Sequence, residues 1–448
     1  MRDAQLLAVS VLERVATGRN LDTELAAVWR QMRQTPPGSQ DTQGLQENAQ
    51  QRALVQDLCY GVLRHRGALD AMLAPLLTKP LRDERLRQLL RIGLYQLQHT
   101  HAAPHAVVDQ AVLACETLPA VAAKGLINAV LRSYLRRKTE LRAVCDLSDV
   151  GRYSFPSWWI DKMRAQYSHL DAQQFADMLQ AGNQHAPLTL RVNPRRTTRA
   201  DYLALLAAQG VSATALERHA VVLEKPMPVQ RIPGFSAGLV SVQDASAQRA
   251  AILLDTQHGM RVLDACAAPG GKTAHILELA DATLTALDHD AARLARVNDN
   301  LQRLGLSARV LRGDAADPSF WWDGAPFDRI LADVPCSGSG VTRRHPDIKW
   351  TRREADIAQF AASQQAIIDA LWRLLAAGGK FLYVTCSVFR EENHLQVARF
   401  IERHADAQPL TLPFDEFPAA TVPQEQLAGQ ILPDAVHDGF YYALLQKN

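Results

Sequence analysis

The sequence predicts a multidomain protein, with an all-α N-terminal domain, a small α+β middle domain and a C-terminal α/β domain containing a doubly wound, Rossmann-like sheet. The chain of 448 residues is too long for one ordinary core. Its first third carries apolar residues at helical spacing only, whereas short apolar runs alternate with helical segments from residue 250 onward. We therefore expect domains at residues 1–142, 143–249 and 250–448.

Helical patterns dominate the N-terminal region. Leu7, Val11 and Val15 share one face of the first predicted helix. Further helices are predicted over residues 53–64, 68–77, 85–97, 106–116 and 124–135. The Gln-rich stretch 31–51 predicts a mobile loop. Arg132 and Arg136 lie on one helical face, which suits either a phosphate-binding patch or a solvated helix end.

The middle region alternates between strand and helix patterns. Apolar and polar residues alternate over 188–193, a helix is predicted over 200–209, and short strands are predicted over 221–223 and 239–242. Its arginines form a basic edge that we expect to contact RNA: Arg191, Arg195, Arg196 and Arg199.

In the C-terminal region, acids and cysteines follow the predicted strands. We expect strands at 262–264, 283–287, 308–312, 327–334 and 380–384, with long helices at 291–304 and 354–375. Ligands bind beyond the carboxyl ends of such strands. A single Asp there could equally cap a helix, but several together predict one pocket. The residues that follow the strands are Asp264, Asp288, Asp314, Asp333 with Cys336, and Cys386.

The loop between Asp264 and Thr273 consists mostly of small residues and predicts a cofactor cradle. Gly270 and Gly271 allow a ligand to approach the main chain. The phosphate-binding pattern G-x-x-x-x-G-K-S/T would require glycine where Cys266 stands, which weakens that interpretation. The S-adenosylmethionine loop of a methyltransferase fits better, with Asp288 positioned for ribose hydroxyls.

Composition limits the class of protein. A formal net charge of +2 means that nucleic-acid binding must depend on local basic patches. The six cysteines form no C-x-x-C pair, which argues against zinc and disulfides, and Pro104 interrupts the only histidine cluster. No signal peptide or membrane-spanning run is apparent. We therefore expect a cytoplasmic monomer without metal or membrane attachment.

Two cysteines at the edge of a nucleotide-binding sheet suit methylation of cytosine at C5. A thiolate that adds to C6 makes C5 nucleophilic, and a second group assists the later breakdown of this adduct. Asp333 could hold N3 and the exocyclic amine of the base. This chemistry alone leaves open whether Cys336 or Cys386 attacks.

The motifs resemble those of the NOL1/NOP2/Sun-type RNA cytosine-C5 methyltransferases over residues 150–448. They comprise the Asp264–Thr273 loop, Asp333-Val-Pro-Cys336-Ser-Gly-Ser-Gly340, the segment from Arg343 to Trp350, and Thr385-Cys386-Ser387 followed by Glu391-Glu-Asn393. The N-terminal region resembles the NusB-type RNA-binding fold.

The resemblance implies a substrate, a cofactor and a role for each site residue. The substrate would be an unpaired or flipped cytosine of 16S rRNA, cytosine 967 by the same resemblance. Cys386 would be the nucleophile, Cys336 would release the product, and Asp333 would lie by the base. The residues lining S-adenosylmethionine would be Cys266, Ala267, Ala268, Pro269, Gly270, Gly271, Lys272, Asp288 at the ribose, Asp314 at the adenine, and Asp333.

Two other functions fit parts of the chain. The Gly-Lys-Thr end of the loop is shared with P-loop ATPases, which require magnesium. The helical N-terminal region by itself would suit a non-catalytic RNA-binding, antitermination-like factor. S-adenosylmethionine binding distinguishes the methyltransferase from both.

Overall fold

The computed structural model describes residues 2–34, 42–118, 121–413 and 429–448, and the chain divides into two compact units. The first unit comprises Met1–Asn183 and Thr342–Arg353, and the second comprises Gln184–Val341 and Glu354–Asn448. The predicted combination of an all-α N-terminal part, a small α+β part and a doubly wound α/β part is confirmed. The three domain boundaries themselves stay a prediction.

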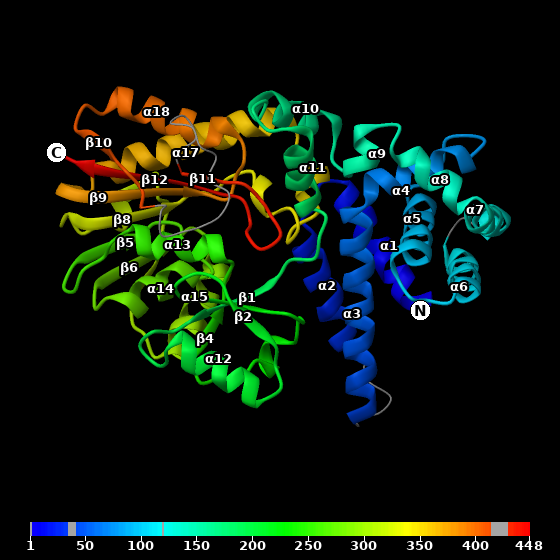
Figure 1. The fold of residues 1–448 in the computed structure, drawn as a ribbon, viewed down its shortest axis with the longest axis horizontal. Coiled ribbons are helices and arrows are strands. Elements are labelled where there is room, and N and C mark those ends of the chain that lie inside the picture. Colours follow the sequence, from blue (N-terminus) through cyan, green and yellow to red (C-terminus); the bar gives the residue numbers. More distant parts are fainter. Residues whose placement is uncertain (1, 35–41, 119–120, 414–428) are drawn as a thin grey trace. The chain divides into compact units, whose positions relative to one another are not determined.

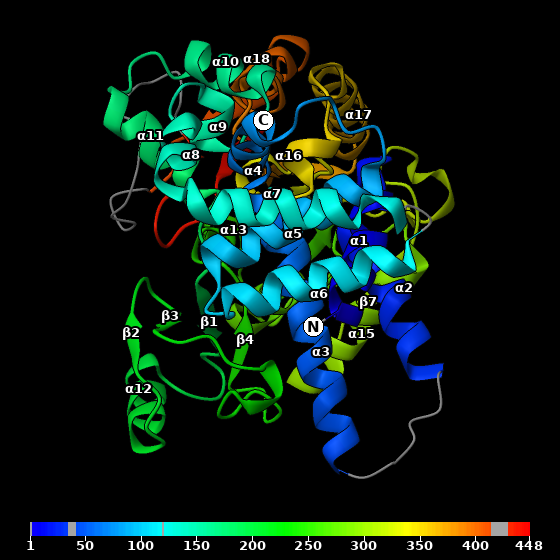
Figure 2. The same ribbon diagram turned by 90° about the vertical axis from the view of Figure 1, so that its right-hand side faces the viewer.

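The first unit is helical throughout its described residues. One hydrophobic core runs through it, and within this core α5, α6 and α7 lie side by side (Figure 2). The helices are α1 (Arg2–Ala16), α2 (Leu21–Gln34), α3 (Thr42–Arg64), α4 (Arg66–Leu73), α5 (Glu84–His99), α6 (Pro104–Thr117), α7 (Lys124–Arg136), α8 (Lys138–Cys145), α9 (Asp149–Tyr153), α10 (Ser157–Gln166) and α11 (Ala172–Ala181).

The prediction of a loop over residues 31–51 is wrong for most of that stretch. Helix α2 continues to Gln34, α3 already begins at Thr42, and residues 35–41 lie outside the described part of the chain. The stretch is rich in Gln, which is a good helix former, and Pro36, Pro37 and Gly38 are confined to the gap between the two helices.

A short segment from the C-terminal half of the chain completes the helical unit. It contains α16 (Ile348–Thr351). Asp347 Oδ2 accepts a hydrogen bond from the Leu21 amide at 3.1 Å. Trp350 Nε1 donates to the Leu63 carbonyl at 2.7 Å. The Arg343–Trp350 motif therefore contributes to the packing of the helical unit.

The second unit contains a small four-stranded antiparallel sheet in the order β2-β3-β1-β4. The strands are β1 (Leu188–Val192), β2 (Ala213–Ala215), β3 (Ala220–Leu223) and β4 (Val240–Val242), and helix α12 (Arg199–Ala208) packs against them (Figure 2). The predicted strands and helix are all present, whereas the short and mostly exposed β2 gave no sequence signal.

The larger sheet has the order β10-β12-β9-β8-β5-β6-β7, and β11 pairs with β12. The five neighbouring strands β9, β8, β5, β6 and β7 are parallel to one another. Strand β12 is antiparallel to both β9 and β10. The strands are β5 (Arg261–Asp264), β6 (Thr283–Asp288), β7 (Arg309–Arg312), β8 (Phe327–Asp333), β9 (Leu375–Thr385), β10 (Ala407–Leu410), β11 (Gln430–Ile431) and β12 (Phe440–Lys447).

Helices cover both faces of this sheet (Figure 1). One face packs against α13 (Ala245–Leu253), α14 (Gly271–Leu279) and α15 (Ala291–Leu304), and the other against α17 (Glu354–Trp372) and α18 (His394–Arg403). The strand order reverses between β5 and β8, so their carboxyl ends form the switch point at which open α/β sheets bind ligands.

Candidate active site

The loop that follows β5 lies close against neighbouring strands. The Ala265 amide donates to the Leu331 carbonyl and the Ala267 amide to the Leu287 carbonyl, both at 2.9 Å. Gly270 has φ +95°, and a Cβ there would lie 3.0 Å from the Val297 Cα. Only glycine combines this backbone conformation with so close a neighbour.

A cavity of about 500 Å³ opens beyond the carboxyl ends of the strands. Such a volume suits a cofactor of nucleoside size. The wall combines acids with apolar surface and includes several predicted site residues. The lining residues are Ala265, Cys266, Ala268, Asp288, His289, Arg293, Gly313, Asp314, Ala315, Asp333, Val334, Pro335, Cys336, Ile367 and Cys386.

The acids in this wall fit S-adenosylmethionine. Asp288 Oδ2 accepts from the Ala268 amide at 3.1 Å and Oδ1 from the Asp290 amide at 3.0 Å, which fixes the carboxylate at the end of β6. Each oxygen has a second acceptor site for a ribose hydroxyl. Asp314 follows β7 at a neighbouring strand end, and Trp321 Nε1 donates to its carbonyl at 2.8 Å.

Not all predicted cofactor residues line this cavity. Cys266, Ala268, Asp288, Asp314 and Asp333 do, whereas Ala267 and Lys272 do not. The remaining three border a separate hollow of about 170 Å³: Pro269, Gly270 and Gly271.

The Lys272 side chain turns toward Asp333. Its Nζ lies 2.6 Å from Asp333 Oδ2 and 5.3 Å from the centre of the Phe440 ring. Burial alone would lower the pKa of Lys272, but the charge and hydrogen bond of Asp333, followed by the charge of Cys386, raise it. Lys272 is therefore a cation held between an acid and a cysteine.

The structure brings Cys336 and Cys386 together. Cys336 follows β8, Cys386 follows β9, and their sulfur atoms are 3.3 Å apart. The hydrogen bond with Cys386, followed by burial, raises the pKa of Cys336 well above its ordinary value. Cys336 therefore favours its protonated, thiol form.

A buried carboxylate, which the sequence did not identify as a site residue, joins the two cysteine loops. Glu392 Oε1 accepts from the Ser337 amide at 2.7 Å, and Oε2 accepts from the Ser337 hydroxyl at 2.6 Å and from the Ser387 hydroxyl. Ser387 is 2.9 Å from the Ser339 hydroxyl. Burial raises the pKa of Glu392. The one available signal was its position shortly after Thr385-Cys386-Ser387.

Cys266 differs from the cysteine pair. Burial, followed by the negative charges of Asp333 and Asp264, raises the pKa of its thiol well above the ordinary value. Because a thiol is a poor nucleophile, Cys266 is suited to packing in the wall of the cofactor cavity.

The phosphate-binding interpretation of the loop meets a geometric difficulty. Thr273, whose hydroxyl would ligate magnesium, is buried and donates to Asp264 Oδ2 at 2.6 Å. Lys272 is engaged by Asp333 rather than lying free in the loop. The two side chains that such a loop requires are thus oriented toward the sheet.

Three arginines of the predicted basic edge have partners within the protein. Arg191 is buried and pairs with Glu278 Oε1 at 2.7 Å. Arg195 pairs with Asp281 and Arg196 donates to the Leu304 carbonyl at 2.6 Å. These arginines attach the small sheet to the larger one, a use that spacing alone could not distinguish from RNA binding.

Two other site types are absent from the described ranges. No group of three or more His, Cys, Asp or Glu side chains is arranged to hold a metal ion among these residues. None of the helices in the described part of the chain has the length and hydropathy needed to cross a membrane.

Three family models match consecutive parts of the chain. The NusB family matches residues 2–136, the ferredoxin-like domain of RsmF/B-like methyltransferases matches 155–230, and the 16S rRNA methyltransferase RsmB/F family matches 251–446.

Similar proteins span nearly the whole chain. Ribosomal RNA small subunit methyltransferase B of Vibrio cholerae serotype O1 is 46% identical over 401 residues, which are 88% of this chain and 89% of that protein. The protein of the same name from Escherichia coli O7:K1 is 44% identical over 402 residues, covering 88% and 90%. A crystal structure of the protein PH0851 has a TM-score of 0.74 at 24% identity, covering 90% of this chain and 93% of that one. At 24% identity, this likeness shows that the two chains share a fold and nothing further.

Proposed function

The chain belongs to the RsmB/F family of 16S rRNA methyltransferases, and from this premise we propose that it methylates C5 of a cytosine in 16S rRNA through a covalent adduct between Cys386 and C6. The target that we propose is cytosine 967. The observation that carries the proposal is the 3.3 Å separation of the Cys336 and Cys386 sulfurs in the wall of the cofactor cavity.

The predicted cofactor, S-adenosylmethionine, is confirmed by the family. When bound, it supplies the electrophilic methyl group. Asp288 would hold its ribose and Asp314 would lie by its adenine, since both acids line the cavity at neighbouring strand ends.

Cys386 is the attacking residue in this proposal. Its charge contributes to the raised pKa of Lys272, so a Cys386 thiolate lies within the field of this cation. Nearby cations favour the thiolate, which is the nucleophilic form. Addition of the sulfur to C6 moves an electron pair toward C5, which then accepts the methyl group.

Cys336 would act after the methyl group has been transferred. Two of the three largest effects that raise its pKa come from Cys386. Once Cys386 is bonded to carbon, these effects disappear and Cys336 releases its proton to solvent more readily. It can then accept the C5 proton, while the electron pair of that C–H bond expels the Cys386 sulfur from C6.

Asp333 would orient the base. Lys272 binds one of its oxygens, Oδ2, and a carboxylate retains acceptor sites for the exocyclic amine of cytosine. The C6 atom of a stacked base is hidden, so we propose that the target cytosine is unpaired or flipped. We further propose that the protein acts as a cytoplasmic monomer without a metal.

The cysteine roles are tested with Cys386→Ala and Cys336→Ala. We expect Cys386→Ala to lower methyl transfer by about a thousandfold or more, and Cys336→Ala to accumulate an RNA adduct that survives a denaturing gel. Cys145→Ala is the matched control, because Cys145 is half-buried in the helical unit. Normal turnover of Cys386→Ala, with loss of both turnover and adduct in Cys336→Ala, would reverse the assignment.

The base and position are tested by bisulfite sequencing of 16S rRNA from cells lacking the protein. We expect loss of the 5-methylcytosine signal at position 967 and its return with the wild-type gene. An unchanged signal there would contradict the proposed target.

A further inference from the structure

We propose that His437 is a positioning residue for the cysteine pair: it fixes the segment 432–439, which in turn holds the turn between Cys336 and Gly340. The inference rests on the proposed function in one respect, the role of Cys386 as nucleophile. It adds a residue outside the cofactor cavity to those on which methyl transfer depends.

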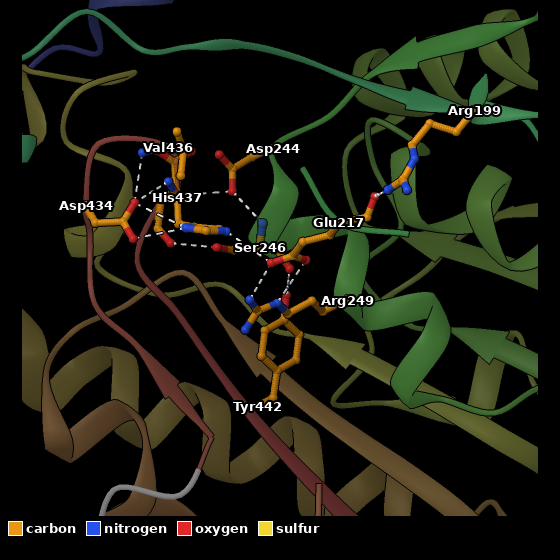
Figure 3. A network of polar contacts seen from close by, with 10 residues as sticks. Arg199, Glu217, Asp244, Ser246, Arg249, Asp434, Val436, His437 and Tyr442 are labelled. Atoms are coloured by element: carbon orange, nitrogen blue, oxygen red, sulfur yellow. Dashed lines mark hydrogen bonds and ion pairs between the residues drawn. The ribbon is translucent and has the colours of Figure 1, made fainter. Parts of the chain in front are cut away.

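His437 (Figure 3) lies in the loop between β11 and β12. Its side chain is 1% exposed. Nδ1 lies 3.0 Å from Asp434 Oδ2 in the same loop, and Nε2 lies 3.1 Å from Glu217 Oε1. Glu217 belongs to the turn between β2 and β3 of the small sheet. The imidazole therefore connects the two sheets of the second unit.

Glu217 is itself held firmly. Arg249 of α13 forms an ion pair with its carboxylate, and the two side chains are 0% and 7% exposed. Arg199 donates to the Glu217 carbonyl (Figure 3). The charged groups that face the imidazole are thus Asp434 of its own loop, Glu217 of the small sheet and Arg249 of α13. His437 cannot shift without breaking its contacts with the buried Glu217 and the partly exposed Asp434.

The loop containing His437 contacts the cysteine loops through two glycines. The Gly439 amide donates to the Gly340 carbonyl at 2.8 Å, and the Gly340 amide donates to the Cys386 carbonyl at 2.9 Å. A Cβ on Gly340 would lie 2.1 Å from the Gly439 oxygen. With no side chain between the two backbones, a displacement of residue 439 would pass directly to Cys386.

The segment is also held on its other side. The Ser246 hydroxyl of α13 donates to the Asp438 carbonyl at 3.0 Å, and the Tyr442 hydroxyl donates to the Ser246 carbonyl. None of His437, Glu217 and Asp434 lines the cofactor cavity. Their effect should consequently fall on the placement of Cys386 and not on cofactor affinity.

The test compares His437→Asn and Glu217→Gln with wild type. We measure kcat and KM for S-adenosylmethionine with a 16S rRNA transcript, and the rate at which iodoacetamide alkylates Cys386 in the absence of RNA. Cys386 is the only cysteine in the tryptic peptide 381–390, so mass spectrometry reads it separately. We expect kcat to fall by about tenfold to a hundredfold, a changed alkylation rate, and a KM within twofold of wild type.

Arg303→Gln is the matched control. Arg303 of α15 donates to the Phe235 and Val240 carbonyls at 2.9 and 3.0 Å, so it also attaches the small sheet to the larger one. Within the described part of the chain, its hydrogen bonds go to Phe235, Val240 and Ser241 and not to the loops that contain the cysteines. If His437 only attaches the small sheet to the larger one, Arg303→Gln and His437→Asn should change kcat and the Cys386 alkylation rate equally. If His437 positions the cysteines, Arg303→Gln should leave the Cys386 alkylation rate unchanged.

The proposal is overturned if His437→Asn and Glu217→Gln retain both kcat and the Cys386 alkylation rate. If His437→Asn does not fold, Glu217→Gln decides the question, because it keeps the shape of the side chain and removes only its charge. If wild type produced no 5-methylcytosine, the proposed function would fail, while the alkylation rates would still decide the role of His437.

Discussion

At the scale of single residues, Lys272 shows how position in a motif differs from position in space. Its place in the Gly-Gly-Lys-Thr loop predicts a cofactor ligand, but its ammonium group lies 2.6 Å from Asp333, on a strand end 61 residues further along the chain. A motif gives the identity of a residue and the backbone that carries it. The direction of a long, flexible side chain depends on partners that the motif does not contain.

We expect Lys272→Met to lower kcat by about tenfold to a hundredfold, because a Cys386 thiolate loses its nearby cation. The pH–rate profile should move to higher pH, and KM for S-adenosylmethionine should change little. Lys380→Met is the control, since Lys380 of β9 pairs with Asp255 and neither residue lines the cavity. A raised KM with unchanged kcat would instead make Lys272 a cofactor ligand.

At the scale of elements, strand ends were the most informative feature of the sequence. The five predicted parallel strands are all present, and their order brings Asp288, Asp314, Asp333, Cys336 and Cys386 to one cavity. The antiparallel strands β10, β11 and β12 were not predicted. β12 pairs with β9 and β10 through contacts between residues that are distant in the sequence, and β11 pairs with β12.

Glu392 joins the loops that follow β8 and β9, and a substitution tests this role. Glu392→Gln removes the charged acceptor of Ser337 and Ser387, so we expect it to destabilise the protein by about 1–3 kcal/mol. Thermal unfolding measures the loss. Glu391→Gln is the neighbouring control, because Glu391 is only partly buried. Equal unfolding midpoints for both variants would contradict the role of Glu392.

At the scale of the whole molecule, buried ion pairs attach the small sheet to the methyltransferase sheet. Arg191 with Glu278 and Arg249 with Glu217 both have side chains at most 7% exposed. The sequence indicated two separate α+β and α/β parts but gave no sign of this attachment, because each pair joins residues at least 32 positions apart. Likewise, no local pattern could assign residues 342–353 to the helical unit.

Breaking one of these buried ion pairs should lower the free energy of unfolding more than breaking an ion pair on the surface. Glu278→Gln leaves the buried Arg191 guanidinium without its counter-charge, so we expect a loss of about 3–5 kcal/mol. Asp281→Asn removes the partner of Arg195 in an exposed pair that solvent screens, and should lower the stability far less. Urea unfolding of the two variants tests this difference, and equal losses would contradict it.

His437 makes stability depend on pH. Burial by itself lowers its pKa, but hydrogen bonds and charges from Asp434 and Glu217 outweigh burial and raise the pKa to about 9. A group with a raised folded-state pKa stabilises the protein fully below its unfolded pKa, about 6.5 for histidine, and this stabilisation is lost as pH rises through about 9. The midpoint of thermal unfolding of wild type should therefore fall toward that of His437→Asn between these values. If the difference in unfolding midpoint between wild type and His437→Asn did not change with pH over this range, His437 would not be charged in the folded protein.

The most direct test of the central claim is to identify the cysteine that bonds to the base. A 16S rRNA fragment with 5-fluorocytosine at the target position is incubated with the protein and S-adenosylmethionine, because the C5 fluorine prevents release of the adduct. After digestion with trypsin and ribonuclease, mass spectrometry distinguishes peptide 381–390, which contains Cys386, from peptide 330–343, which contains Cys336. We predict the nucleotide on Cys386. A nucleotide on Cys336, or methylation of an unmodified fragment with no adduct from the fluorinated one, would contradict the account.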